Sequence, residues 1–124
     1  MIKIHLLFMS LMFVLIFTSF LFILYGKRKR VIIHKILSIL GISSGVVGII
    51  IMIIFKIQNS YPHLKSSHSI FGVTGFLFLL SNSISGYLIT KRKIKLKILH
   101  KITGFTGILL SLIAVITGLI RNLF

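Results

Sequence analysis

The chain has 124 residues, 56% of them hydrophobic, and carries 15 Lys and Arg residues but no Asp or Glu. Its mean hydropathy of +1.12 excludes a soluble domain, because too few polar residues are left to cover a surface in water. The lack of cysteine excludes disulfides, thiolate zinc sites and cysteine-ligated iron–sulfur clusters. The charge of +15 does not indicate a nucleic-acid partner, since the basic residues lie in short gaps between long apolar runs, as in membrane proteins.

Four uncharged runs are each long enough to cross a bilayer: Leu6–Tyr25, Ile36–Phe55, Ser66–Thr90 and Ile102–Ile120. About 20 helical residues cross the hydrocarbon layer, which is roughly 30 Å thick. We therefore predict membrane-spanning helices at about 5–25, 34–55, 67–90 and 100–120. The connections are too short to fold separately, so successive helices should be antiparallel neighbours. The predicted fold is all-α, an integral membrane antiparallel four-helix bundle that forms a single domain over residues 1–124.

The cations divide unequally between the two faces that this topology defines. One face would carry eleven: Lys27, Arg28, Lys29, Arg30, Lys35, Lys91, Arg92, Lys93, Lys95, Lys97 and Lys101. The other would carry four: Lys3, Lys56, Lys65 and Arg121. Positive residues favour the cytoplasmic side of short loops, so we predict that both termini are non-cytosolic. The pattern leaves open which cell or organelle membrane holds the protein.

Histidines introduce the first functional prediction. His63 lies in a predicted loop and is interpreted as a solvated residue. The other four fall one per predicted helix, each near the N-terminal end of its span: His5, His34, His68 and His100. Antiparallel packing then places the histidines of the first and third spans at similar depth near the outer face. The histidines of the second and fourth spans should lie together near the inner face.

Pairs of imidazoles on facing helices are typical axial ligands of haem iron. Positions three, four and seven residues after a helical residue share its face. Four and seven residues after His68 and His100 the sequence has glycine: Gly72, Gly75, Gly104 and Gly107. Small residues also follow His34, namely Ser38, Gly41 and Gly45, whereas Met9 and Met12 follow His5. The helix faces that follow His34, His68 and His100 would leave room for a flat macrocycle.

Two simpler interpretations stay open at this point. Small residues at these spacings also let membrane helices pack closely without any ligand. A histidine near a bilayer surface is often only a polar anchor, so the protein could be a non-catalytic structural membrane protein. A zinc site is less favoured, because two imidazoles near each face fall short of the usual three or four ligands.

The first span opens with a His followed four residues later by Met, as His5 and Met9 show. The third and fourth open with HxxxG, in HSIFG from His68 and HKITG from His100, and the second contains HKILSILG from His34. Their ends read ISGYL and ITGL, which contain Gly86 and Gly118. This ordered set resembles the four core helices of the cytochrome b561 family. The resemblance is best with the type that often accompanies an extracellular DOMON domain.

The resemblance implies two b-type haems, one ligated by His5 and His68 and the other by His34 and His100. It also implies electron transfer across the membrane, as in a transmembrane oxidoreductase, often from cytosolic ascorbate to an external acceptor such as monodehydroascorbate or ferric iron. The chain departs from the family at Ser38, where Gln is frequent, and at Phe20, where a Gly is expected. We expect the four-helix core without a DOMON or other soluble domain, so the donor and acceptor stay open.

The expected partners are the lipid bilayer, a small-molecule electron donor such as ascorbate, a redox partner protein and a second copy of the chain in a homodimer. Lys35 and Lys101, each next to a candidate ligand, could pair with the anionic propionates of haem b. An alternative function is a haem-binding anchor subunit that links a quinone to a soluble redox enzyme. The spans contain no acidic residue, which disfavours a proton pump or a cation-coupled carrier.

Overall fold

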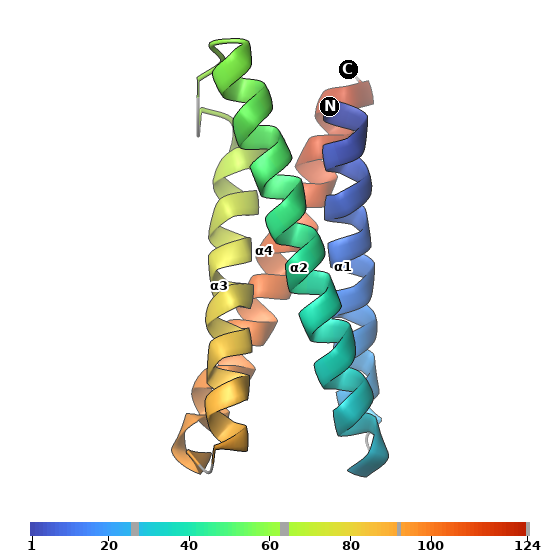
Figure 1. The fold of residues 1–124 in the computed structure, drawn as a ribbon, viewed down its shortest axis with the longest axis vertical. Coiled ribbons are helices and arrows are strands. Elements are labelled where there is room, and N and C mark those ends of the chain that lie inside the picture. Colours follow the sequence, from blue (N-terminus) through green and yellow to red (C-terminus); the bar gives the residue numbers. More distant parts are fainter. Residues whose placement is uncertain (26–27, 63–64, 92, 124) are drawn as a thin grey trace. The chain divides into compact units, whose positions relative to one another are not determined.

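The structure, a computed structural model, describes residues 1–25, 28–62, 65–91 and 93–123. This part of the chain contains four long α-helices, α1 (Ile2–Leu24), α2 (Arg28–Gln58), α3 (Ser67–Thr90) and α4 (Lys97–Leu123), shown in Figure 1. A short 3-10 turn, η1 (Ile94–Leu96), leads directly into α4. His63 and two of the counted cations, Lys27 and Arg92, lie outside the described residues.

Four segments are long and apolar enough to cross a membrane: Ile2–Leu24 in α1, Arg30–Gln58 in α2, Ser67–Thr90 in α3, and Ile94–Ile120, which comprises η1 and most of α4. The prediction of an all-α, multi-pass membrane protein with four spanning helices is therefore confirmed. The observed helices α2 and α4 also extend beyond the predicted spans into basic sequence. Lys and Arg are good helix formers whose long side chains reach water, so a helix can continue past the hydrocarbon layer.

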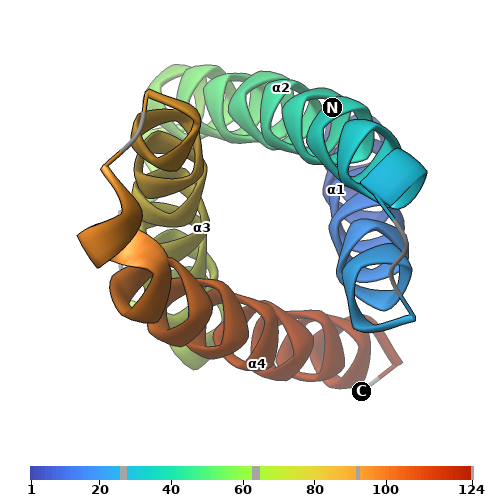
Figure 2. The ribbon, with the colours of Figure 1, turned by 90° about the horizontal axis from the view of Figure 1, so that it is seen from below.

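The described chain divides into two compact units, Met1–His63 and Leu64–Phe124. In the first unit α1 packs along α2, and in the second α3 packs along α4. The paired helices of each unit run in opposite directions, as the ribbons in Figures 1 and 2 show. Each unit is thus an antiparallel helical hairpin, as short connections require.

Small residues bring α1 and α2 together. A Cβ added to Gly41 would lie 2.8 Å from Cγ1 of Ile16, and one added to Gly48 would lie 2.9 Å from Sδ of Met9. Met12 and Ile16 are the buried apolar residues of this interface on α1. In membranes, close backbone approach at small residues takes the place of the hydrophobic effect in holding helices together.

The interface between α3 and α4 is built in the same way. A Cβ on Gly107 would lie 2.8 Å from the Leu79 side chain and 3.0 Å from its backbone nitrogen. A Cβ on Gly75 would lie 3.0 Å from the backbone nitrogen of Ser111. Leu79, only 2% exposed, is the most buried apolar residue of this hairpin. The exposed large hydrophobic residues of the described helices are mostly Ile, Leu and Val, which suits contact with lipid.

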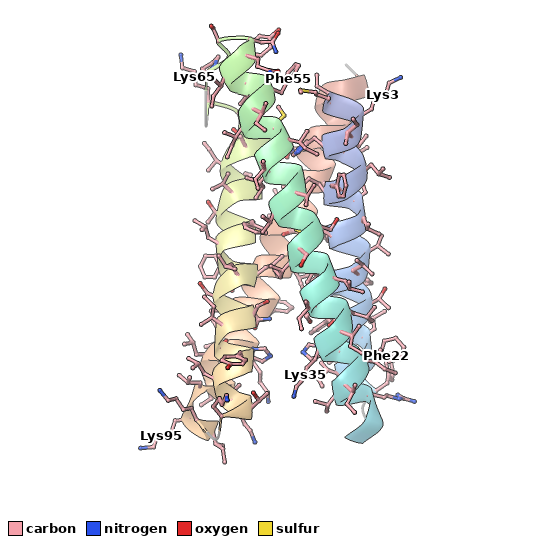
Figure 3. The ribbon with its side chains drawn as sticks, viewed as in Figure 1. Lys3, Phe22, Lys35, Phe55, Lys65 and Lys95 are labelled. Carbon is pink, nitrogen blue, oxygen red and sulfur yellow. The ribbon has the colours of Figure 1, made fainter. Side chains whose placement is uncertain are left out.

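Cations gather at the ends of each hairpin, with apolar side chains between them. In the first hairpin Lys3 lies near one end and Lys35 near the other, and in the second Lys65 and Lys95 lie at opposite ends (Figure 3). The predicted division of the cations between two membrane faces requires this arrangement within each hairpin. The membrane side of each end is still a prediction.

Candidate functional site

The four helical histidines all lie close to the start of their helices and are half-buried. His5, His68 and His100 lie in the first turns of α1, α3 and α4, and His34 lies in the second turn of α2. The start of α3 is capped by Ser66, whose hydroxyl accepts from the backbone N–H of Ser69. This cap fixes the turn that carries His68.

Within the first hairpin, each histidine is held by the other helix. Nδ1 of His5 lies 2.8 Å from the carbonyl oxygen of Gly48 on α2. Nδ1 of His34 lies 3.1 Å from the carbonyl oxygen of Ser19 on α1 and 2.7 Å from the hydroxyl of the same serine. Each imidazole therefore bridges the two helices near one end of the hairpin.

The second hairpin repeats this arrangement. Nδ1 of His68 lies 2.7 Å from the carbonyl oxygen of Ala114 on α4. Nδ1 of His100 lies 2.9 Å from the carbonyl oxygen of Asn82 on α3 and 3.3 Å from the hydroxyl of Ser85. As in the first hairpin, each helix supplies one imidazole and accepts a hydrogen bond from the imidazole of the other helix.

A single spacing relates all four contacts. The residue whose carbonyl holds the partner imidazole follows the histidine of its own helix by 14 positions: Ser19 after His5, Gly48 after His34, Asn82 after His68 and Ala114 after His100. Fourteen residues are close to four helical turns, so histidine and acceptor lie on one face of the helix. The two hairpins are therefore internal repeats of one pattern.

The carbonyl contacts determine which ring nitrogen carries the proton. A carbonyl oxygen can only accept, so Nδ1 donates in each case, and in a neutral imidazole the lone pair is then on Nε2. A histidine that ligates a metal typically has this arrangement, with the second ring nitrogen donating to a carbonyl, carboxylate or water. The donor chemistry of all four histidines thus fits axial ligation of haem iron.

Distance prevents the two histidines of one hairpin from binding the same iron. His34 is bonded to Ser19, which lies 14 residues beyond His5 on α1. At 1.5 Å per residue this places the two imidazoles about 21 Å apart along the helix axis. His68 and His100 are separated in the same way through Asn82. Each hairpin therefore offers one imidazole near each of its ends.

Three of the four glycines predicted to make room for porphyrin lie against the partner helix. Gly75 and Gly107 form the close contacts between α3 and α4, and a Cβ on Gly104 would lie 2.9 Å from Oδ1 of Asn82. A Cβ on Gly72 would meet only Cβ of Ala114, at an ordinary 3.8 Å. Helix packing is thus sufficient to explain three of these glycines, and their role toward a porphyrin stays a prediction.

Sequence reasoning did not assign a role to two other glycines that touch the imidazoles. A Cβ on Gly118 would lie 2.8 Å from Nδ1 of His68, and a Cβ on Gly86 would lie 2.9 Å from Cε1 of His100. Each glycine follows the histidine of its own helix by 18 positions, one turn beyond the carbonyl acceptor. A fixed spacing from the histidine of the same helix is the signal that could have identified these glycines, at 18 positions, and the acceptors Ser19 and Asn82, at 14 positions.

The predicted propionate partners are exposed. Lys35 and Lys101 each follow a histidine directly, in the repeated dipeptide His-Lys, and their side chains lie on the surface of α2 and α4. Exposed ammonium groups next to a candidate ligand are suitable partners for a carboxylate. Their pairing with propionates is still a prediction.

The amino-acid sequence can be compared with known protein families. A family model described as eukaryotic cytochrome b561 matches residues 1–124, the whole chain. The chain belongs to the eukaryotic cytochrome b561 family. Comparison with the curated proteins and with the solved structures found no match. Cytochromes b561 are haem-binding membrane proteins that transfer electrons, so the predicted family, cofactor class and membrane location are confirmed.

Proposed function

We propose that this cytochrome b561 carries electrons across the membrane through two b-type haems, one near each face. His5 and His68 would ligate the outer haem, and His34 and His100 the inner one. In this proposal both hairpins act together as one domain, and every haem takes one ligand from each hairpin. The haems supply a one-electron Fe(III)/Fe(II) couple near each face.

The observation that carries this proposal is the set of four Nδ1–carbonyl hydrogen bonds, at 2.7 to 3.1 Å. They assign the ring proton to Nδ1 at all four histidines, and this is the tautomer in which a histidine can ligate a metal through Nε2. The separation of about 21 Å within a hairpin requires that the second ligand of each iron come from elsewhere. From the predicted order of the helices in the membrane, we infer that His5 pairs with His68 and His34 with His100.

Other residues would support binding of the haems. Gly72 is the candidate with most space at its Cα, since a Cβ there would make one ordinary contact. Lys35 and Lys101 would neutralise propionates near the inner face. Gly75, Gly104 and Gly107 would contribute indirectly, because they let α3 and α4 approach closely enough to form the bonds to His68 and His100.

The exposed cations support a small anionic electron donor at the inner face. Lys93, Lys95 and Lys97 are exposed around η1, a few residues before His100. A dense positive surface raises the local concentration of anions and their rate of arrival. We propose ascorbate, or a reductant of similar charge, as donor and an external oxidant such as ferric iron or monodehydroascorbate as acceptor. The protein would then act as a transmembrane oxidoreductase.

Single substitutions of the histidines test the pairing. His5→Ala and His68→Ala should both lose the outer haem and keep the inner one, whereas His34→Ala and His100→Ala should do the reverse. A site that loses one axial imidazole keeps only its partner, and the chain has no Cys, Asp or Glu to replace it. Haem content per chain, the reduced spectrum and the midpoint potential of the surviving haem are measured.

The control is His63→Ala, which should retain both haems. Met9 lies one turn after His5, and a thioether can serve as an axial ligand that raises the potential. His68→Ala is therefore the cleaner variant for the outer haem. A double variant at His34 and His100 that still binds two haems would exclude the assignment. A His68→Ala variant with unchanged haem content would do the same.

A further inference from the structure

Serine hydroxyls contact the imidazole nitrogens at one end of each hairpin. Ser19 Oγ lies 2.7 Å from Nδ1 of His34, and Ser85 Oγ lies 3.3 Å from Nδ1 of His100. Ser19 is 1% exposed and Ser85 is 4% exposed, so neither contact is exchanged easily for water. Both histidines belong to the proposed inner haem.

The hydrogen-bond network around Ser19 determines the direction of its contact. The hydroxyl donates its one proton to the carbonyl oxygen of His34 at 2.9 Å, because a carbonyl can only accept. Its lone pairs then accept from Nδ1–H of His34 and from the hydroxyl of Ser38, which lies 2.7 Å away. Ser38 is therefore the donor in that pair and holds Ser19 in place.

The hydrogen bonds around Ser85 determine in the same way to which atom its hydroxyl donates. Its hydroxyl donates to the carbonyl oxygen of Asn82 at 2.9 Å, so it accepts from Nδ1–H of His100. The Nδ1 proton of each of these two histidines thus has two acceptors, a hydroxyl and a backbone carbonyl. The contact at Ser85 is longer than the one at Ser19, and its effect should be smaller.

We propose that Ser19 and Ser85 are positioning residues that hold His34 and His100 as Nδ1–H tautomers and lower the midpoint potential of the haem that these histidines ligate. An imidazole whose Nδ1–H is strongly bonded is a better electron donor through Nε2, and a better donor stabilises ferric iron. This inference rests on the proposed function. It adds a means by which the chain itself tunes one of the two haems.

The effect should be confined to one haem. Ser19 lies about 21 Å from His5 along α1, and Ser85 lies still farther beyond His68 on α3, so neither hydroxyl can reach the outer ligands. Replacing either serine leaves the backbone carbonyl in place as an acceptor. Ligation should therefore survive, and only the strength of the bond to Nδ1 should change.

The test is redox titration of Ser19→Ala and Ser85→Ala. Ser19→Ala should raise the midpoint potential of the inner haem, and the ratio of reduced to oxidised haem at the original midpoint should rise roughly two- to tenfold, as for one hydrogen bond. Ser85→Ala should shift the same haem by less. Ser44→Ala is the matched control, because Ser44 is a buried serine of the same hairpin whose hydroxyl bonds to the carbonyl of Phe8.

A second readout does not depend on a redox titration. In ¹⁵N NMR of the purified, reduced protein, His34 and His100 should show a protonated Nδ1, and the Nδ1–H signal of His34 should move in Ser19→Ala. If that variant does not fold, Ser19→Cys fills the same space with a weaker acceptor and should shift the signal and the potential in the same direction.

The possible outcomes distinguish failure of this inference from failure of the proposed function on which it rests. Two bound haems with unchanged potentials in Ser19→Ala would overturn the inference alone. An unprotonated Nδ1 on His34 would overturn both the inference and the proposed ligation of iron by Nε2 of His34, because a neutral imidazole then carries its proton on Nε2. Potential shifts in two different haems would overturn the pairing of His34 with His100 on which it rests. A protein purified without haem would overturn the proposed function and the effect on potential, and the NMR signals would then decide the positioning role of Ser19.

Discussion

Nδ1 of His68 donates to the carbonyl oxygen of Ala114 across α3 and α4, over 2.7 Å. The imidazole reaches this oxygen because Gly118, one turn farther along α4, has no side chain in its way. The candidate ligand His68, its acceptor Ala114 and Gly118 therefore form one structural group, to which both α3 and α4 contribute. The same grouping recurs at His100, with Asn82 as acceptor and Gly86 as the small residue.

Gly118→Ala should displace His68. The added Cβ would lie 2.8 Å from Nδ1, closer than a methyl group tolerates, so the ring must move and its bond to Ala114 must weaken. We expect partial or complete loss of the same haem that His68→Ala removes, measured as haem content per chain. The neighbouring Leu119→Ala, at an exposed position, is the control. A Gly118→Ala variant with two haems and unchanged potentials would contradict the role given to this glycine.

Gly107→Ala should weaken the second hairpin itself. Its Cβ would lie 3.0 Å from the backbone nitrogen of Leu79, and a backbone atom cannot rotate away, so α3 and α4 must separate. The cost of such overpacking is about 1–3 kcal/mol. Thermal unfolding in detergent, followed by helical circular dichroism, measures the loss. Gly72→Ala, whose Cβ would meet Ala114 at 3.8 Å, should lower the melting temperature much less.

Membrane sidedness can be tested with introduced cysteines, because the chain has none of its own. Ser60 follows α2 and Lys93 precedes η1, and both positions are exposed. The eleven-to-four division of cations predicts that Ser60→Cys reacts with an impermeant thiol reagent from the non-cytosolic side, whereas Lys93→Cys does not. The opposite labelling pattern would exchange the haems named inner and outer.

Reduction by an anionic donor should depend on salt. Attraction between the donor and the exposed Lys93, Lys95 and Lys97 falls as ionic strength rises, since the Debye length is about 8 Å at 0.15 M. The initial rate of haem reduction by ascorbate should therefore decrease with added salt. It should decrease further when these three lysines are replaced by Gln. A rate that does not respond to salt would indicate a quinone or a protein donor instead.

The spans were predictable because composition and the length of the uncharged runs determine them. Uninterrupted apolar runs of about 20 residues can only be membrane helices, and the run that ends at Thr90 was predicted to the residue. The ends of α2 and α4 were predicted less well. Hydropathy marks where charges begin, whereas a helix continues through Arg30 and Lys97 into the region outside the hydrocarbon.

The hydrogen-bond acceptors of the histidines were not predicted, because they are backbone carbonyls. Every residue has one, and the side chain does not indicate which of them accepts. Gly48, Asn82 and Ala114 share no side-chain property beyond modest size, and only their common distance from a histidine relates them. Gly75 and Gly107 were read as space for a porphyrin, but a glycine pattern alone cannot separate a ligand cavity from a close helix crossing. That distinction requires knowing which helix faces which.

The reciprocal spacing of 14 residues has a consequence for how such a chain can vary. One residue inserted between His100 and Ala114 would turn that carbonyl by about 100° around α4 and release His68, although neither interacting group had been altered. The same holds for the corresponding segment of each other helix. Insertions and deletions should therefore be tolerated in the connections and near the helix ends, but not in the four stretches between a histidine and the carbonyl on its own helix.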